Sequence, residues 1–131
     1  MKEPHWIGRD VVLAIHEQLL ALHGGSAGIR DEGLLDSALG RPLNLFAYEQ
    51  ASLFAMAASY AGGIIRNHPF IDGNKRTGFV LCAVFLERNG YELVASEEEA
   101  TVTTLAFAAS EIKEAEYAAW LEHNSRRAHR T

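Results

Sequence analysis

Two apolar runs separated by a short polar stretch constrain the fold of this chain more than any other feature of its sequence. Residues 51–65 and 79–86 are almost entirely apolar, and between them lie residues 68–78, HPFIDGNKRTG. A helix that is apolar on nearly every side is stable only when other helices surround it. We therefore expect central helices over residues 51–67 and 75–89, joined by the polar stretch as a loop.

The rest of the chain predicts further helices around this pair. Apolar spacing and helix-start residues indicate a helix over residues 9–23, a short one over residues 31–40 and another over residues 97–109. Residues 110–122 supply aromatic and aliphatic anchors for a last segment. The predicted fold class is all-α, a compact bundle of about six helices in a single domain over residues 1–131.

Three stretches are expected to be irregular. Residues 41–50 have little helical spacing and are interpreted as a connector, and residues 91–95 as an extended linker without a partner. The tail, residues 123–131, carries three arginines and is expected to be frayed. Two titratable groups are interpreted as structural or solvated: His16, at the margin of an apolar stripe, and the acidic run 97–99 at a helix start.

Charge and composition exclude several function classes. The net charge is −5, and residues 1–122 hold all 17 acids and only 9 of the 12 basic residues. Because a nucleic-acid binder normally presents a basic face, we expect no direct nucleic-acid binding. No apolar run is long enough to span a bilayer, no signal peptide is evident, and Cys82 is the only cysteine. A cytoplasmic protein without a membrane partner is predicted.

The polar loop contains the residue types of a proton-transfer site. Pro69 disfavours helix at His68, so the first central helix should end there with the imidazole at its edge. A histidine accepts protons near neutral pH and is the side chain used most often for general-base catalysis. Phe70 is the only large aromatic residue of the loop and should be buried as its anchor.

The residues that follow predict an anion site. Gly73 permits a close backbone approach, and Asn74 is expected to cap the second central helix. The unpaired N–H groups of a helix start favour phosphate, and the cations Lys75 and Arg76 oppose the helix dipole unless an anion is bound.

Two further residues complete the predicted phosphate site. Asp72 is a candidate ligand for Mg²⁺, and Arg66 is close enough in sequence to reach the phosphates. Together with His68, these residue types indicate phosphoryl or nucleotidyl transfer. The alternative for each residue taken singly is an ordinary turn or surface residue. A P-loop is excluded, because no Gly-Lys-Ser/Thr follows a strand.

The order His-Pro-Phe-x-Asp-Gly-Asn-Lys-Arg over residues 68–76 resembles the signature of the Fic/Doc superfamily, HPFx(D/E)GN(G/K)R. Lys75 is typical of the Doc (death-on-curing) toxins of type II toxin–antitoxin pairs. Fic adenylyltransferases have Gly at that place and a second Arg where this chain has Phe79. Further similarity extends over about residues 8–122.

The resemblance implies a toxin with the Fic/Doc fold that transfers the γ-phosphate of ATP to a Ser or Thr of a translation factor such as elongation factor Tu. It implies His68 as the base, Asp72 as the Mg²⁺ ligand, and Gly73, Asn74, Lys75 and Arg76 as phosphate-binding residues. The implied partner is a Phd-type antitoxin across the cleft, and residues 41–50 would border that cleft. The alternatives are a Fic-type transferase of AMP and a non-enzymatic binding module.

Overall fold

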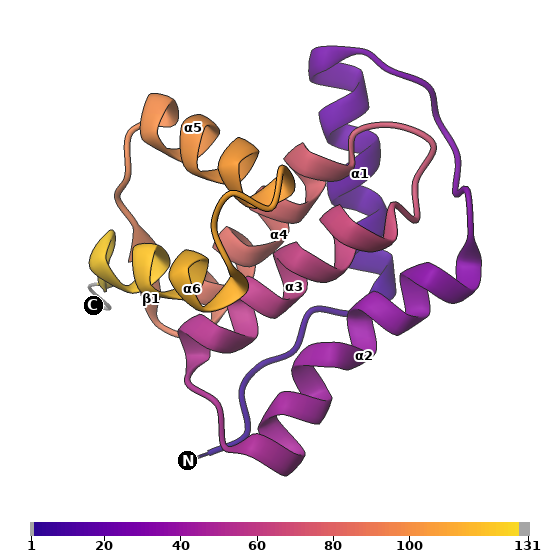
Figure 1. Ribbon diagram of the computed structural model, residues 1–131. Helices are drawn as coiled ribbons and strands as arrows, with labels where there is room; N and C mark the ends of the chain where they lie inside the picture. Colours follow the sequence, from indigo (N-terminus) through magenta and orange to yellow (C-terminus); the bar gives the residue numbers. More distant parts are fainter. Residues whose placement is uncertain (1, 129–131) are drawn as a thin grey trace.

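The computed structural model describes residues 2–128 and is built almost entirely of helices (Figure 1). The elements in chain order are α1 (Arg9–His23), α2 (Glu32–Glu49), α3 (Leu53–Asn67), α4 (Asn74–Arg88), β1 (Tyr91–Leu93), α5 (Glu97–Ala108), α6 (Glu114–His123) and β2 (Ser125–Arg127). The predicted all-α class is confirmed, and within the described residues the number of helices is six.

Helices α3 and α4 form the centre of the bundle, as the two apolar runs predicted (Figure 1). The Ser52 side chain accepts a hydrogen bond from the Ala55 N–H and begins α3, in which every residue from 56 to 65 is buried. Gly63 and Gly78 allow close packing. A Cβ atom at Gly63 would lie 2.9 Å from the Cβ of Ala38, and one at Gly78 would lie 3.0 Å from the Ala61 carbonyl oxygen.

Helix α2 corrects one prediction, because it does not end at Gly40 but continues through Pro42 to Glu49. A proline inside a helix removes one backbone hydrogen bond and costs roughly 3 kcal/mol. Tertiary contacts oppose this cost: Pro42 is buried, and the Arg41 guanidinium pairs with Glu114 of α6 at 3.1 Å. The segment 41–50 is therefore mostly helix rather than connector.

A short antiparallel sheet corrects two more predictions. Strand β1 is paired with β2 in the register Tyr91 to Arg127, Glu92 to Arg126 and Leu93 to Ser125. The expectation that residues 91–95 have no partner is wrong for β1, and the expectation of a frayed tail is wrong for β2; residues 129–131 lie outside the described part. Arg126 also pairs with Glu92 across the sheet at 3.4 Å.

The buried thiol of Cys82 lies in the interior of α4 and not in the loop. Burial raises the pKa of Cys82 to about 12, so the thiolate is absent near neutral pH. Tyr117 of α6 lies in the same interior, where its hydroxyl is hydrogen-bonded to Thr104 at 2.8 Å and burial raises its pKa. These groups belong to the core.

No helix among residues 2–128 combines the length and the apolar character that crossing a membrane requires.

Candidate active site

The loop between α3 and α4 is held by the side chain of Asn74. Phe70 is fully buried, its N–H donates to Asn74 Oδ1 at 3.1 Å, and its carbonyl accepts from Asn74 Nδ2 at 3.0 Å. Asn74 is thus not the N-cap that the sequence suggested; Gly73 occupies that position, with φ 79°. The Asn74 amide is only 3% exposed and is engaged in holding the loop, so it is not available to bind phosphate.

Arg30, in the segment between α1 and α2, binds the backbone at the end of α3. His68 ends α3 in the left-handed conformation, with φ 51° and ψ 54°, and its carbonyl accepts from Arg30 Nε at 2.7 Å. Arg30 also donates to the Asn67 carbonyl at 2.8 Å, and its own N–H donates to the Pro69 carbonyl at 2.6 Å. Three successive carbonyls at the end of α3 are therefore capped, and the backbone that carries the His68 imidazole is fixed.

The start of α4 is open to an anion. Its first intrahelical hydrogen bond runs from the Thr77 N–H to the Gly73 carbonyl, and no side chain caps the helix. Among the described residues, the N–H groups of Asn74, Lys75 and Arg76 have no hydrogen-bond partner. Lys75 and Arg76 are exposed and make no ion pair within the same part of the chain. The helix dipole, three N–H groups and two cations thus favour a negatively charged ligand.

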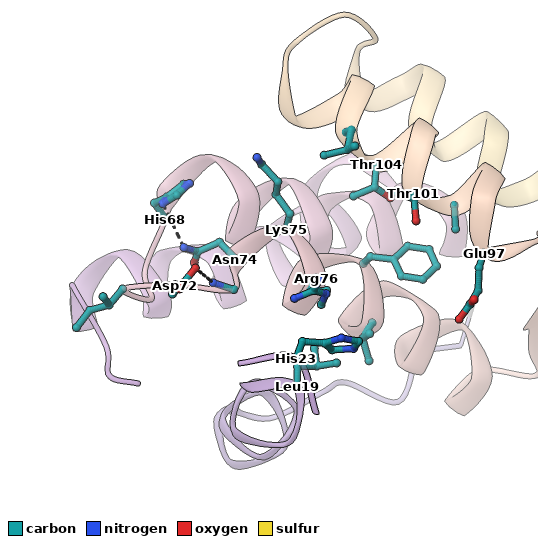
Figure 2. Close-up of a pocket in the computed structure, with 16 residues that line it drawn as sticks. Leu19, His23, His68, Asp72, Asn74, Lys75, Arg76, Glu97, Thr101 and Thr104 are labelled. Carbon is teal, nitrogen blue, oxygen red and sulfur yellow. Dashed lines mark hydrogen bonds between the residues drawn. The ribbon is translucent and has the colours of Figure 1, made fainter. Parts of the chain in front are cut away.

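This helix start opens into a cleft of about 660 Å³ between α1, α4 and α5. Figure 2 shows His68 and Asp72 at one end, Lys75 and Arg76 in the middle, and Thr101 and Glu97 of α5 at the other end. The walls along α4 and α5 carry the apolar side chains of Phe79, Val80, Ala100 and Leu105 beside the polar Glu97, Thr101 and Thr104. The cleft therefore has a charged end at the loop, and most of its apolar side chains lie along α4 and α5.

Asp72 has the donor chemistry for one magnesium ligand. Its side chain is exposed in the cleft, Oδ1 accepts from the Gly73 N–H at 2.9 Å, and Oδ2 accepts from the Ser26 N–H at 3.2 Å. Both bonds orient the carboxylate and leave lone pairs on each oxygen. Mg²⁺ binds proteins through one or two carboxylates and completes its shell with phosphate oxygens and water, so the oriented Asp72 carboxylate suits this ion.

The orientation of Asn74 also determines where the His68 proton lies. Because Asn74 Oδ1 accepts from one backbone group and Nδ2 donates to another, Nδ2 is the atom that faces His68 Nδ1, at 3.1 Å. Nδ1 of the neutral ring is therefore the acceptor, and Nε2 carries the proton. A hydroxyl that gives its proton to Nδ1 must first displace the Asn74 amide, or the ring must turn over.

The structure brings together most of the residues predicted from the loop. His68, Asp72, Gly73, Asn74, Lys75 and Arg76 all line the cleft. Arg66 does not: its guanidinium lies over the Phe107 ring, 5.0 Å from the centroid. With 3.6 residues per turn, a residue two positions before His68 leaves the helix on nearly the opposite side. The segment 41–50 does not line the cleft either, because α2 continues away from the loop (Figure 1).

Several cleft residues were not found from the sequence. Leu19 and His23 of α1 and the α5 wall belong to elements far from the loop in sequence, and Glu97 was interpreted only as part of a solvated helix start. A signal for Leu19 was its place on the apolar stripe of α1. Nothing local indicates that His23 or Glu97 borders the cleft.

The sequence matches a known protein family and is similar to known proteins. The family model described as "Fic/DOC family" matches residues 6–86. The chain is 35% identical over 98 residues to "Protein kinase doc" of Escherichia phage P1, which covers 74% of this chain and 78% of that protein. It is 41% identical over 76 residues to "Toxin Doc" of Mycolicibacterium smegmatis, which covers 55% of this chain and 57% of that protein.

Proposed function

The chain belongs to the Fic/DOC family, and from this premise we propose that it is a Doc-type toxin that transfers the γ-phosphate of ATP to a Ser or Thr hydroxyl of another protein. The observation that carries the proposal is the start of α4, where three unpaired N–H groups, Lys75 and Arg76 lie next to His68. Both similar proteins are Doc proteins by name, one a protein kinase and the other a toxin.

Each loop residue has a role in this reaction. Once the Asn74 amide has moved off His68 Nδ1, this nitrogen takes the proton of the acceptor hydroxyl. The hydroxyl oxygen forms a bond to the γ-phosphorus while the bond to the β,γ-bridging oxygen breaks and ADP leaves. Lys75, Arg76 and the N–H groups of residues 74–76 bind the phosphates and balance the charge that moves to the leaving oxygen. Gly73 contributes a backbone without a side chain at this point of approach.

Asp72 would hold Mg²⁺, which when bound would supply positive charge to neutralise the phosphates. The two backbone N–H groups on the Asp72 carboxylate hold it in place before the ion binds. Arg66 has no part in the proposal, because its guanidinium lies against Phe107 outside the cleft.

The two ends of the cleft favour transfer of the γ-phosphate over transfer of AMP. The apolar side chains along α4 and α5 suit the flat nucleobase, and His68 lies at the opposite, charged end (Figure 2). A nucleotide bound in this direction has its terminal phosphate nearest the base. Lys75 and Phe79, at the places where Fic adenylyltransferases have Gly and Arg, favour the same outcome.

Two partners follow from the family. The protein substrate is proposed to be a translation factor such as elongation factor Tu, whose phosphorylation would arrest growth. The neutralising partner is proposed to be a Phd-type antitoxin that covers the cleft and keeps substrate from His68.

Labelled ATP distinguishes the proposal from its alternatives. The protein is incubated with a cell extract, Mg²⁺ and ATP labelled at either the α- or the γ-phosphate. Label from the γ position on a protein of the extract is expected, and His68→Ala should reduce it by about 10²–10⁴-fold, while the control His123→Ala in exposed α6 leaves it unchanged. Transfer of α label would instead identify AMP transfer, and no transfer of either label would favour a binding module.

Induced expression tests the toxin role separately. The wild-type protein should arrest growth and His68→Ala should not, with equal amounts of each protein confirmed. Equal, harmless growth of both strains would contradict the toxin proposal.

A further inference from the structure

We propose that His16 is a positioning residue for Asp72, acting from beneath the active-site loop through the peptide bond between Asp72 and Gly73. The inference rests on the proposed function, in which Asp72 is the magnesium ligand. It assigns to His16 a role in the site rather than the structural role that its sequence position suggested.

His16 belongs to α1 but its contacts are with the loop. Its side chain is buried, with 5% of the residue exposed, and its ring is stacked on the Phe70 ring with centroids 3.8 Å apart and an angle of 10°. A Cβ atom at Gly73 would lie 3.6 Å from His16 Cδ2. The imidazole therefore packs against the buried side of the loop, at Phe70 and Gly73.

One polar contact joins the His16 imidazole to the backbone of the loop. His16 Nε2 lies 2.8 Å from the Asp72 carbonyl oxygen. Because a carbonyl oxygen only accepts, Nε2 carries the proton and donates it. Phe70 and Asn74 are anchored by their mutual hydrogen bonds, and the Ile71 N–H donates to the Gly28 carbonyl at 3.1 Å. The bond from His16 is the one that holds the Asp72 carbonyl.

The conformation of Gly73 explains why the bond from His16 to the Asp72 carbonyl matters. Gly73 has φ 79° and ψ 17°, a left-handed conformation that glycine adopts without strain. Glycine adopts negative φ values as readily, so the Asp72–Gly73 peptide can rotate between two forms. A hydrogen bond from His16 to the carbonyl of that peptide selects one form.

The selected form determines what the carboxylate contacts. With the peptide carbonyl directed at His16, the N–H of the same peptide donates to Asp72 Oδ1 at 2.9 Å. A flipped peptide would withdraw this N–H and leave the carboxylate with the Ser26 N–H alone. Groups that hydrogen-bond a metal-binding carboxylate typically contribute about 10–100-fold to metal affinity or activity.

A pair of substitutions separates the donor from the ring. His16→Phe retains an aromatic ring against Phe70 but has no N–H, whereas His16→Gln loses the ring and retains an N–H donor of similar reach. Amide hydrogen exchange at Gly73, followed by NMR in the ligand-free protein, reports the peptide directly. Exchange at Gly73 should be at least about tenfold faster in His16→Phe than in the wild type and largely restored in His16→Gln, an effect of the size expected for one lost hydrogen bond.

The second measurement is the free Mg²⁺ concentration that gives half-maximal γ-phosphate transfer at saturating ATP. His16→Phe should raise it by about tenfold, and His16→Gln should return it close to the wild-type value. Unchanged Gly73 exchange in His16→Phe would overturn the inference, as would equal defects in both variants that parallel their loss of melting temperature. A wild-type protein without Mg²⁺-dependent transfer would refute the proposed function instead, and Gly73 exchange would still decide the role of His16.

Discussion

Two helices begin at the edges of the same cleft, and their first turns are built in opposite ways. At α5 the Ser96 side chain accepts from the Glu99 N–H at 3.1 Å, and Glu97, Glu98 and Glu99 fill the first turn. At α4 no side chain caps the helix, and the first turn contains Lys75 and Arg76. Acids near a helix start stabilise it and cations destabilise it. The first turn of α5 thus contains its own negative charges, whereas the first turn of α4 contains none and would be stabilised by a bound anion.

The two starts also differ in what holds them in position. The α5 start depends on a hydrogen bond between residues only three positions apart, from the Glu99 N–H to the Ser96 side chain. The α4 start depends on the loop before it, through buried Phe70 and the Asn74 side chain. An open helix start is thus maintained by packing elsewhere, which leaves its N–H groups available to a ligand.

The largest expected effect tests this dependence on packing. Phe70→Ala should lower the free energy of unfolding by about 3–5 kcal/mol, because it opens a cavity beneath the loop. Urea or thermal unfolding measures the loss. Ile71→Ala in the same loop is the control, since Ile71 is 54% exposed and its removal should change stability by less than about 0.5 kcal/mol. Equal losses in the two variants would mean that Phe70 does not anchor the α4 start.

Charge reversal at α4 should separate stability from activity. Lys75→Glu should reduce γ-phosphate transfer by about 100-fold, because charged hydrogen bonds to phosphate are lost. The same variant should raise the free energy of unfolding by about 0.3–1 kcal/mol, because an acid suits the helix dipole. Transfer assays and melting curves on one preparation test both signs. A variant that is inactive and also less stable would contradict the contrast between the two helices.

Removal of the α5 cap should have the converse result. Ser96→Ala should lower the free energy of unfolding by about 1 kcal/mol and leave the transfer rate within about twofold, because Ser96 satisfies a helix N–H and does not line the cleft. Ser96→Asp, which retains a capping oxygen, is the matched control. A large loss of transfer at unchanged stability would place the α5 start in the reaction.

The smallest expected effect on stability comes from the opposite charge reversal, in the first turn of α5. Glu98→Lys places a cation in the first turn of α5 and should lower the free energy of unfolding by about 0.3–1 kcal/mol without affecting transfer, since Glu98 does not line the cleft. Raising the salt concentration should diminish this difference, because the interaction is screened. If the difference persists at high salt, the dipole is not its cause.

Local signals account for the parts of the fold and site that were predicted. The central pair was visible because apolar side chains cover nearly every side of 51–65 and 79–86, and Ser96 begins α5 because a cap acts within three residues. The loop was predicted as the site from residue types alone, and the structure brings His68, Asp72, Lys75 and Arg76 to one cleft.

Where local preference and distant contacts disagree, the distant contacts prevailed. The helix that begins near Asp31 was expected to end at Gly40, and α2 continues because Pro42 is buried and Arg41 pairs with Glu114. Asn74 suits a helix cap by type, and it binds Phe70 instead because the loop returns over it. Residues 91–93 had no partner within reach along the chain, and their partner is β2 at the other end of the α5–α6 segment.

The sequence by itself determined the all-helical class, the central pair and the position of the polar loop, since each depends on periodicity or on neighbours a few residues apart. Only the tertiary structure decided that Arg66 faces away from the cleft, that α1 and α5 form its walls, and that His16 supports the loop. These features depend on contacts between residues far apart in the chain, and no local pattern in the sequence records which pairs will meet.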